Sequence, residues 1–422
     1  MRLSSAQLAP LRLEGFRNLF FATLGSSVGT LLAVVALAID VKDRTSASPH
    51  SGLWVGAVLV VEFLPTIVVG LLLGPLLDRL ERRSLMIAAD ALRVGVFVAL
   101  PFAPNAVTVV GLALVAGLAT GFFRPAVYAG VPNLVPEEDL PSANALLQTV
   151  ENASWAVGPL VGGVLTAVAG PSAAYGINAA SFVVSIALLV RIPPRLLQSG
   201  RALSRGYWRD LGDGFGAALR SPSMRAVLVG WGIASFATGA ANVSEIFLAK
   251  DTFSAGDFGY GLLYGALGGG LVLGSFASAA VLARYGVAVV YGSALAVMAV
   301  GYVAAAVSPD VWVAAACCTV VGVGNGAAVA CNALLVQRGT FDLLRGRALT
   351  FVMSVTYALL GVGEGLGGLF LHRAGARWLW GGAGGSMLVA ALAGSLLARK
   401  LGSESAAEAE VRPGTAPVAA AN

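Results

Sequence analysis

The sequence predicts an all-α polytopic membrane protein, and both its composition and the length of its apolar runs indicate this. Apolar residue types make up 57% of the 422 residues and charged types 12%, against about 25% charged residues in soluble domains. A soluble fold could not hide so much apolar surface from water, and a disordered chain would have low hydrophobicity. Two histidines and three cysteines are too few for a multi-histidine metal site or a disulfide framework. We therefore expect no metal and no cofactor. No catalytic residues are expected either, because His50 and His372 both fall in predicted outer loops and no nucleophile–base pair is visible.

The apolar runs are long enough to form transmembrane helices. A hydrocarbon core of about 30 Å needs about 20 residues of helix, and a helix satisfies its own backbone groups. Tight hairpins such as Pro101–Asn105 and Gly170–Ser172 separate several runs. Twelve transmembrane helices are predicted, at residues 16–40, 52–77, 84–104, 106–128, 142–167, 174–192, 225–248, 258–283, 289–307, 311–335, 348–371 and 379–398.

The distribution of lysine and arginine predicts which loops face the cytoplasm. With the N-terminus inside, 21 of the 27 basic residues lie in cytoplasmic segments and five in outer loops, while Arg93 lies within a helix. Cytoplasmic loops of membrane proteins carry such an excess. We therefore expect both termini in the cytoplasm. The pI of about 9.3 reflects this topology and does not indicate nucleic-acid binding.

The longest internal loop divides the chain into two sets of six helices. A weak repeat supports the same division, since Gly158–Gly163 resembles Gly363–Gly368 at an offset of 205 residues. Parallel six-helix halves with a site at their interface are typical of transporters. We expect an N-terminal half at 1–192, a cytoplasmic loop at 193–224, a C-terminal half at 225–400 and a disordered cytoplasmic tail at 401–422.

A short motif joins the second and third predicted helices, and it reads Gly-Pro-Leu-Leu-Asp-Arg-Leu-Glu-Arg-Arg. A hairpin this short needs a glycine for close packing, and its aspartate can cap a helix or pair with a basic neighbour. The motif resembles the corresponding loop of the major facilitator superfamily, with matches at Gly74, Asp78, Arg79, Arg82 and Arg83. The resemblance implies twelve helices in two pseudo-symmetric halves, and a gating role in which Asp78 latches the cytoplasmic side closed.

The fifth predicted helix carries a second motif, formed by Gly158, Pro159, Gly162 and Gly163. Proline permits a bend in a membrane helix, and glycines let another helix approach closely. The motif is similar to that of drug:proton antiporters in the superfamily, which implies export. Resemblance to the bacterial macrolide-efflux and enterobactin-exporter branch lies in the stretches Arg124–Ala126, Pro132–Leu140 and Asp90–Arg93. Asp90 and Arg93 stand at i, i+3, so we expect a structural ion pair.

Four acidic residues lie inside predicted helices: Glu62, Glu151, Glu245 and Glu364. An ionised side chain at the bilayer centre costs a few kcal/mol unless it is paired, neutral or facing water. Few basic residues share the depth of these acids, so salt bridges for all four are not expected. Removal from water favours the neutral acid, which suits reversible protonation. The four residues are candidates for proton coupling or substrate binding, although each one alone could be a neutral acid hydrogen-bonded to a neighbouring helix.

These features predict a secondary active transporter that exports a small amphiphilic compound, such as a drug, antibiotic or natural product, by proton antiport with alternating access. Arginine outnumbers lysine 24 to 3, as in bacteria with GC-rich genomes, so we expect a monomer in a bacterial cytoplasmic membrane. Its partners would be the substrate, protons and the lipid bilayer. One alternative is a siderophore exporter or nutrient importer of the same fold. The other, from a different class, is a membrane-embedded lipid-handling protein or enzyme.

Overall fold

The computed structural model describes residues 8–72, 80–197, 221–338 and 345–411, and all regular structure in these ranges is helical. Ten helical stretches there are long and apolar enough to cross a membrane. The prediction of an all-α membrane protein is therefore confirmed. The long helices are α1 Glu14–Arg44, α2 Ser51–Leu72, α4 Arg82–Ala99, α5 Ala106–Gly130, α6 Leu140–Val190, α8 Pro222–Phe247, α9 Gly256–Tyr285, α10 Val287–Ala306, α11 Val311–Arg338, α12 Arg345–Ala374 and α13 Ala376–Val411. Short 3₁₀ segments lie at Ala9–Arg12, Leu100–Phe102, Val131–Asn133, Glu137–Asp139 and Pro194–Leu196, and a π-helical turn, η6, at Leu248–Thr252.

Helix α6 contains a break at the position of a predicted hairpin. Its 51 residues include Gly170, whose φ of 77° lies in the left-handed region that glycine adopts without strain. The expected spans 142–167 and 174–192 fall on either side of this break. Helix α2 is not among the ten crossing candidates, and its stretch Ser51–Glu62 counts as a shorter apolar helix.

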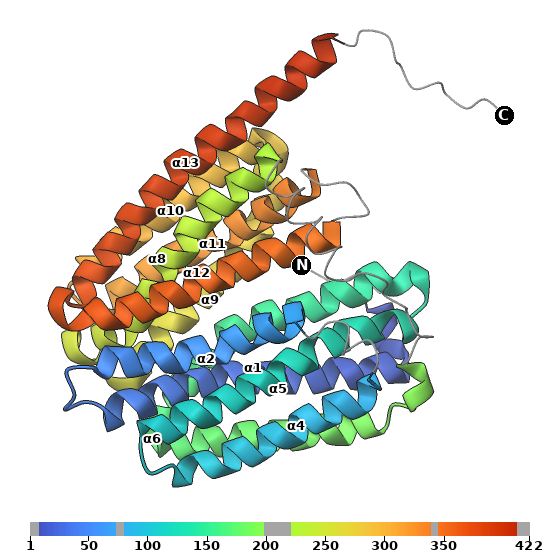
Figure 1. The fold of residues 1–422 in the computed structure, drawn as a ribbon, viewed down its shortest axis with the longest axis vertical. Coiled ribbons are helices and arrows are strands. Elements are labelled where there is room, and N and C mark those ends of the chain that lie inside the picture. Colours follow the sequence, from blue (N-terminus) through green and yellow to red (C-terminus); the bar gives the residue numbers. More distant parts are fainter. Residues whose placement is uncertain (1–7, 73–79, 198–220, 339–344, 412–422) are drawn as a thin grey trace.

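The helices form two groups that lie side by side (Figure 1). Helices α1, α2, α4, α5 and α6 pack on one another, and helices α8 to α13 form the second group. The main contacts between the groups join α6 to α9 and α2 to α12. A Cβ atom added to Gly163 of α6 would lie 2.6 Å from the Cα of Gly261 on α9. Small residues therefore allow the two groups to approach closely, as is common between membrane helices.

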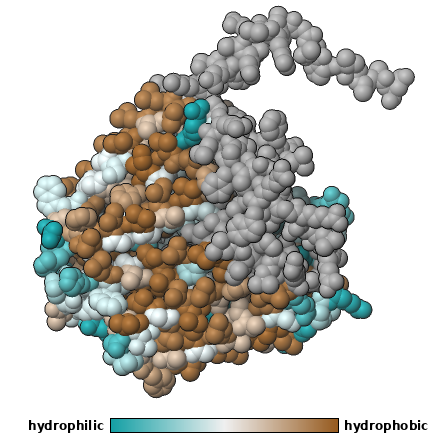
Figure 2. All heavy atoms as spheres, viewed as in Figure 1, coloured by the Kyte–Doolittle hydropathy of each residue, from teal (hydrophilic) through white to brown (hydrophobic). Residues whose placement is uncertain are grey.

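The surface carries a broad apolar band between polar edges (Figure 2). Many large apolar side chains among the described residues are exposed, and those of Phe102 and Val168 are both 83% exposed. A contiguous apolar surface of this size is rare on soluble monomers. The band therefore fits a multi-pass protein whose flank contacts lipid chains.

Local sequence signals set several helix ends. Asn105 accepts a hydrogen bond from the backbone N–H of Thr108 at 3.0 Å at the start of α5. Asp310 likewise accepts hydrogen bonds from the backbone N–H groups of Trp312 and Val313 at the start of α11. Such caps satisfy donors that the first turn of a helix leaves unpaired.

Candidate functional site

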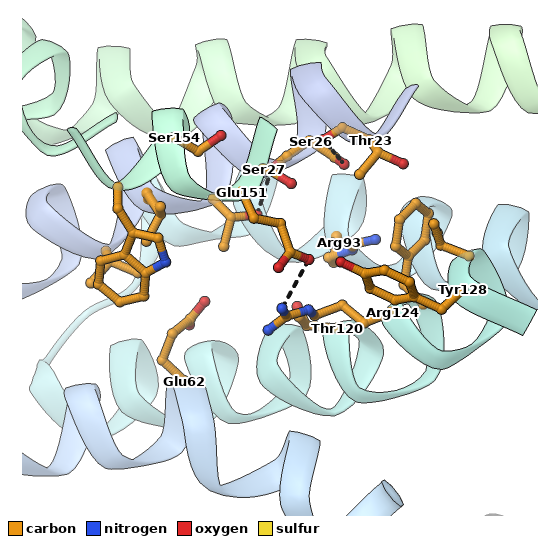
Figure 3. A pocket seen from close by; sticks show the side chains of 16 residues that line it. Thr23, Ser26, Ser27, Glu62, Arg93, Thr120, Arg124, Tyr128, Glu151 and Ser154 are labelled. Atoms are coloured by element: carbon orange, nitrogen blue, oxygen red, sulfur yellow. Dashed lines mark hydrogen bonds and ion pairs between the residues drawn. The ribbon is translucent and has the colours of Figure 1, made fainter. Parts of the chain in front are cut away.

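A pocket lies among helices α1, α2, α4, α5 and α6 of the N-terminal group (Figure 3). Its lining combines hydroxyl groups, aromatic rings, two carboxyl groups and two guanidinium groups. Apolar walls with a few convergent polar groups are typical of small-molecule sites. The lining residues are Thr23, Ser26, Ser27, Thr30, Leu31, Val34, Glu62, Arg93, Thr120, Phe123, Arg124, Val127, Tyr128, Glu151, Ser154 and Trp155.

Two of the four candidate acids, Glu62 on α2 and Glu151 on α6, lie in this pocket. Arg124 of α5 pairs with Glu151, with 2.9 Å between Nη2 and Oε1 (Figure 3). Glu151 thus has a basic partner, and this one pair is compatible with the expectation that the four acids do not all form salt bridges. Counting charges along the chain assigned Arg124 to the cytoplasmic end of a helix, whereas its side chain turns into the pocket toward Glu151.

Arg93 connects the predicted Asp90–Arg93 ion pair with the pocket that contains the candidate acid Glu62. It forms an ion pair with Asp90, one turn earlier on α4, and the two side chains are 3% and 0% exposed. Its guanidinium lies between two rings, 4.5 Å from the centroid of Phe123 and 4.4 Å from that of Phe182, which is a favourable cation–π arrangement. Glu62 also lies within electrostatic range of Arg93. Arg93 therefore pairs with Asp90 and lines the same pocket as Glu62, and these three groups together are neutral when one of the two carboxyl groups is protonated.

The other two candidate acids lie outside the pocket, in the C-terminal group. Glu245 on α8 is 2% exposed and Glu364 on α12 is 1% exposed. Helix α12 packs closely on α2 beside Glu364. The glycine at position 56 permits this, since a Cβ atom added there would lie 2.8 Å from the carbonyl oxygen of Glu364. The structure thus divides the four candidates into one pair in the pocket and one pair in the other group.

The gating motif falls partly outside the described residues, which exclude Gly74, Asp78 and Arg79. The side chains of its last two arginines, at the start of α4, donate hydrogen bonds of 2.6 to 3.2 Å to backbone carbonyls. Arg82 reaches Ala129 and Leu197, and Arg83 reaches Leu189 and Val190. Three of these carbonyls lie in the last turns of α5 and α6, where cations stabilise the negative end of a helix. The arginines thus hold helix ends within the N-terminal group, a role that sequence reasoning did not predict.

The glycine motif of α6 faces two helices. It contacts α1 through Gly158 and Gly162, and α9 through Pro159 and Gly163. A Cβ atom added to Gly162 would lie 2.6 Å from the carbonyl oxygen of Leu32 on α1. The motif therefore packs α6 against its own group and against the other group.

Ion pairs between the end of α1 and the segment η6–α9 also join the groups. The Lys42 Nζ lies 2.8 Å from a carboxylate oxygen of Asp251. The Lys250 Nζ lies 2.6 Å from Asp43 and 2.7 Å from Asp257. Sequence reasoning missed these pairs, and the available signal was that Lys42 and Lys250 are two of only three lysines in the sequence.

Comparison with known sequences identifies the family. A family profile described as transmembrane secretion effector matches residues 5–419. The MFS-type transporter YkuC of Bacillus subtilis is 28% identical over 251 residues, which are 56% of this chain and 57% of YkuC. Macrolide efflux protein A of Enterococcus faecalis is 29% identical over 173 residues, covering 40% and 54% of the two chains. Multidrug efflux pump Tap of Mycolicibacterium fortuitum is 29% identical over 179 residues, covering 40% and 42%. The chain spans about half the length of these relatives.

Solved transporter structures share the fold. A mutant form of the peptide transporter POT superposes with a TM-score of 0.72 at 12% identity, covering 92% of this chain and 95% of that one. A bacterial homologue of the iron transporter ferroportin, in an inward-facing state, gives 0.70 at 16% identity, covering 92% and 98%. The chain therefore belongs to the transmembrane secretion effector family and is a multi-pass membrane transporter of the major facilitator superfamily.

Proposed function

We propose that this transporter exports a small amphiphilic compound from a bacterial cell by proton antiport. Relatives described as a macrolide efflux protein and a multidrug efflux pump support export. The aromatic rings, hydroxyl groups and carboxyl groups of the pocket support a substrate with both apolar and polar parts.

The proposed architecture is two six-helix halves, at residues 1–192 and 225–400, that alternate access to the pocket. If both segments of α6 and helix α2 cross the membrane, the ten candidate spans become twelve. The contacts of α6 with α9 and of α2 with α12 would then form the interface on which the halves rock. Each ligand can shift such an equilibrium only by its differential affinity for the two states.

The single observation that carries the coupling is that Glu62 lines the same pocket as Arg93, which forms an ion pair with Asp90. With Glu62 protonated, the Asp90–Arg93 pair is balanced. Release of that proton leaves one excess negative charge at the pocket wall, which favours a cationic or hydrogen-bond-donating substrate. A proton and the substrate therefore compete for the same charge, and this competition is the antiport step.

Efflux from proteoliposomes under an imposed pH gradient, with a macrolide as the probe, tests this proposal. Glu62→Gln mimics the permanently protonated acid, so gradient-driven transport should be lost while binding of the probe loses its pH dependence. Glu138→Gln, in an exposed turn before α6, is the matched control. Gradient-driven transport by Glu62→Gln at the rate of Glu138→Gln would show that Glu62 does not couple the proton.

We also propose that both termini face the cytoplasm. Single cysteines at Ser48, between α1 and α2, and at Ser84, at the start of α4, would lie on opposite sides. In a background without Cys317, Cys318 and Cys331, an impermeant thiol reagent added to intact cells should label only the cysteine at Ser48. Labelling of the cysteine at position 84 alone would show that the orientation is the reverse of the proposed one.

A further inference from the structure

A second pocket, the junction pocket, lies at the end of the molecule where α1 joins α2 and α12 joins α13, on the left in Figure 1. Its volume is about 560 Å³, within the range of about 300–1,000 Å³ that is typical of small-molecule sites. The N-terminal group contributes residues between Lys42 and Gly52. The C-terminal group contributes Phe247, the η6 turn and residues between Leu371 and Ala376. The junction pocket therefore belongs to both groups of helices.

A lysine and an aspartate from opposite groups form the charged part of the junction pocket. The Lys42 Nζ lies 2.8 Å from a carboxylate oxygen of Asp251 and 5.0 Å from the centroid of the Phe247 ring. The side chain of Lys42 is 8% exposed, whereas that of Asp251 is 56% exposed. An ammonium group has three N–H donors and a carboxylate has about four acceptor sites. The pair is thus neutral as a whole and can still donate and accept further hydrogen bonds.

Hydroxyl groups and an imidazole ring complete the polar lining. Ser46 and Ser48 lie in the loop between α1 and α2, and Ser51 begins α2. Thr252 lies in η6, and His372 lies near the end of α12. A hydroxyl group both donates and accepts hydrogen bonds, and a neutral imidazole does one at each nitrogen. The lining therefore presents donors and acceptors side by side around one neutral ion pair.

The π-helical turn η6 provides an independent sign of a binding site. The backbone N–H of Phe253 donates a hydrogen bond to the carbonyl oxygen of Leu248 at 3.0 Å, which is the i→i+5 spacing of a π-helix. Such turns are rare and occur frequently at functional sites. Asp251 and Thr252 both lie within η6 and both line the junction pocket. The irregular backbone thus coincides with the polar lining.

The charge balance of the junction pocket favours a neutral ligand. Lys42 and Asp251 are the only lysine, arginine or acidic residues among its described lining residues. An anion would lie beside Asp251 and an organic cation beside Lys42, and placing like charges together is costly. A saccharide can accept a hydrogen bond from Lys42 and donate one to Asp251 while the pair stays intact. Phe247 and Leu371 supply apolar surface for the C–H groups of a sugar ring.

A ligand in the junction pocket would contact both groups of helices at once. The groups meet at its wall, because a Cβ atom added to Gly52 of α2 would lie 2.9 Å from the Cδ2 atom of Leu371 on α12. A compound bonded to both groups has all of its contacts only while the groups are together at this end. A ligand shifts an equilibrium toward the state that it binds more tightly. Occupancy therefore favours the arrangement in which this end is closed.

We propose that the junction pocket binds a neutral saccharide, and that the bound saccharide holds the two groups of helices together at this end. Lys42 and Asp251 supply its charged hydrogen-bond partners, and Thr252 supplies a hydroxyl partner from η6. Access of the saccharide from outside the cell and its effect on transport rest on the proposed function. Its binding to the junction pocket does not.

Saturation-transfer NMR of the full chain in lipid nanodiscs tests the site, with sucrose as the probe and empty nanodiscs as the blank. Irradiation of the protein should saturate sucrose protons, and a titration gives the Kd. Asp251→Asn should raise the Kd about tenfold, because it removes the charge from one hydrogen-bond partner. Thr252→Val, at an exposed position, should raise it about threefold. Ser172→Ala is the matched control, since this exposed serine lies outside the junction pocket.

Three results of this titration would overturn the assignment. Absence of transfer to sucrose in wild type would show that the junction pocket binds no saccharide. The same Kd in Asp251→Asn, Thr252→Val and Ser172→Ala would place the bound sucrose elsewhere. Transfer to choline or acetate, tested in the same way, but not to sucrose would assign the junction pocket to a charged ligand.

The effect on the two groups of helices has its own measurement. Spin labels at Ala47, between α1 and α2, and at Arg373, near the end of α12, report the distance between the groups at this end. In a background without the three native cysteines, sucrose should increase the population of the shorter distance. The same labels in Thr252→Val should need more sucrose for this change. An unchanged distance distribution at saturating sucrose would show that the ligand does not hold the groups together.

The site and the proposed function can fail separately. Sucrose outside macrolide-loaded proteoliposomes, at equal osmolarity on both sides, should slow gradient-driven export. Sucrose binding together with absence of macrolide export would contradict the exporter assignment and leave the saccharide site standing. Gradient-driven export together with absence of sucrose binding would leave the exporter and remove the site.

Discussion

The two pairs of candidate acids differ in the groups that surround them. In the pocket, Glu151 has Arg124, and Glu62 shares Arg93 with Asp90. In the C-terminal group, the two acids face tyrosines, an asparagine and a cysteine, with no arginine or lysine among the described residues that act on them. Burial alone therefore does not define what an acid can do. The pocket contains two guanidinium groups beside its carboxyl groups and suits exchange of ligands, whereas the C-terminal pair has no basic partner among the described residues.

The largest expected effect comes from removing the arginine that the pocket acids share. Arg93→Met leaves Asp90 and Glu62 buried without their counter-charge, and breaking a buried pair costs about 3–5 kcal/mol. Thermal unfolding of the detergent-purified protein should show this loss. The double variant Asp90→Asn/Arg93→Met should recover much of the stability, because it removes the pair as a whole.

A matched control is Arg124→Met. Its side chain is 46% exposed, against 3% for that of Arg93, so Glu151 can be solvated after the change. This variant should lose clearly less stability. Equal losses of stability in Arg93→Met and Arg124→Met would mean that the difference in burial does not make one ion pair more important for stability than the other.

A smaller loss of stability is expected at the contact between α6 and α9, which holds the two groups of helices side by side. In Gly163→Ala, the new Cβ atom would lie 2.6 Å from the Cα of Gly261, and backbone atoms cannot yield as a flexible side chain can. Overpacking of this kind costs about 1–3 kcal/mol. Gly176→Ala on the same helix has no atom within 4 Å, so it should be neutral or slightly stabilising. The two unfolding temperatures provide the test, and equal values would contradict close packing of α6 on α9.

Much of the fold could be predicted from the sequence, because apolar runs and loop charges act locally. The break at Gly170 and the positions of four acids within long helices were identified in this way. The partners of those acids could not be, since they depend on how helices rotate against one another. Arg124 is a loop-end residue when read along the chain, yet it pairs with Glu151. Tyr264 has no sequence feature that sets it apart, and only packing brings its ring against that of Trp155, which lines the pocket.

The ion pairs of Lys250 should contribute less to the free energy of unfolding than the Asp90–Arg93 pair or the contact of Gly163 with Gly261. Asp43, which Lys250 contacts across the two groups, is 52% exposed, and exposed pairs contribute about 0.2–1 kcal/mol. Lys250→Gln should therefore lower the unfolding temperature slightly. The difference from wild type should shrink in high salt, which screens exposed charges. A large loss that persists in high salt would show that these pairs are as important as the buried pair of Arg93.

The smallest effect on stability is expected from the double variant Glu245→Gln/Glu364→Gln. Glutamine has nearly the shape of a protonated glutamic acid, so replacing two neutral acids should change the unfolding temperature at neutral pH very little. If the acids were ionised and held by a bound metal cation, the same change would remove the ligands of that cation and its stabilising effect. Glu62→Gln is the corresponding variant in the pocket, because it removes a negative charge that acts on Arg93. A stable double variant that no longer couples export to the pH gradient would establish that the C-terminal acids carry protons without holding the fold together.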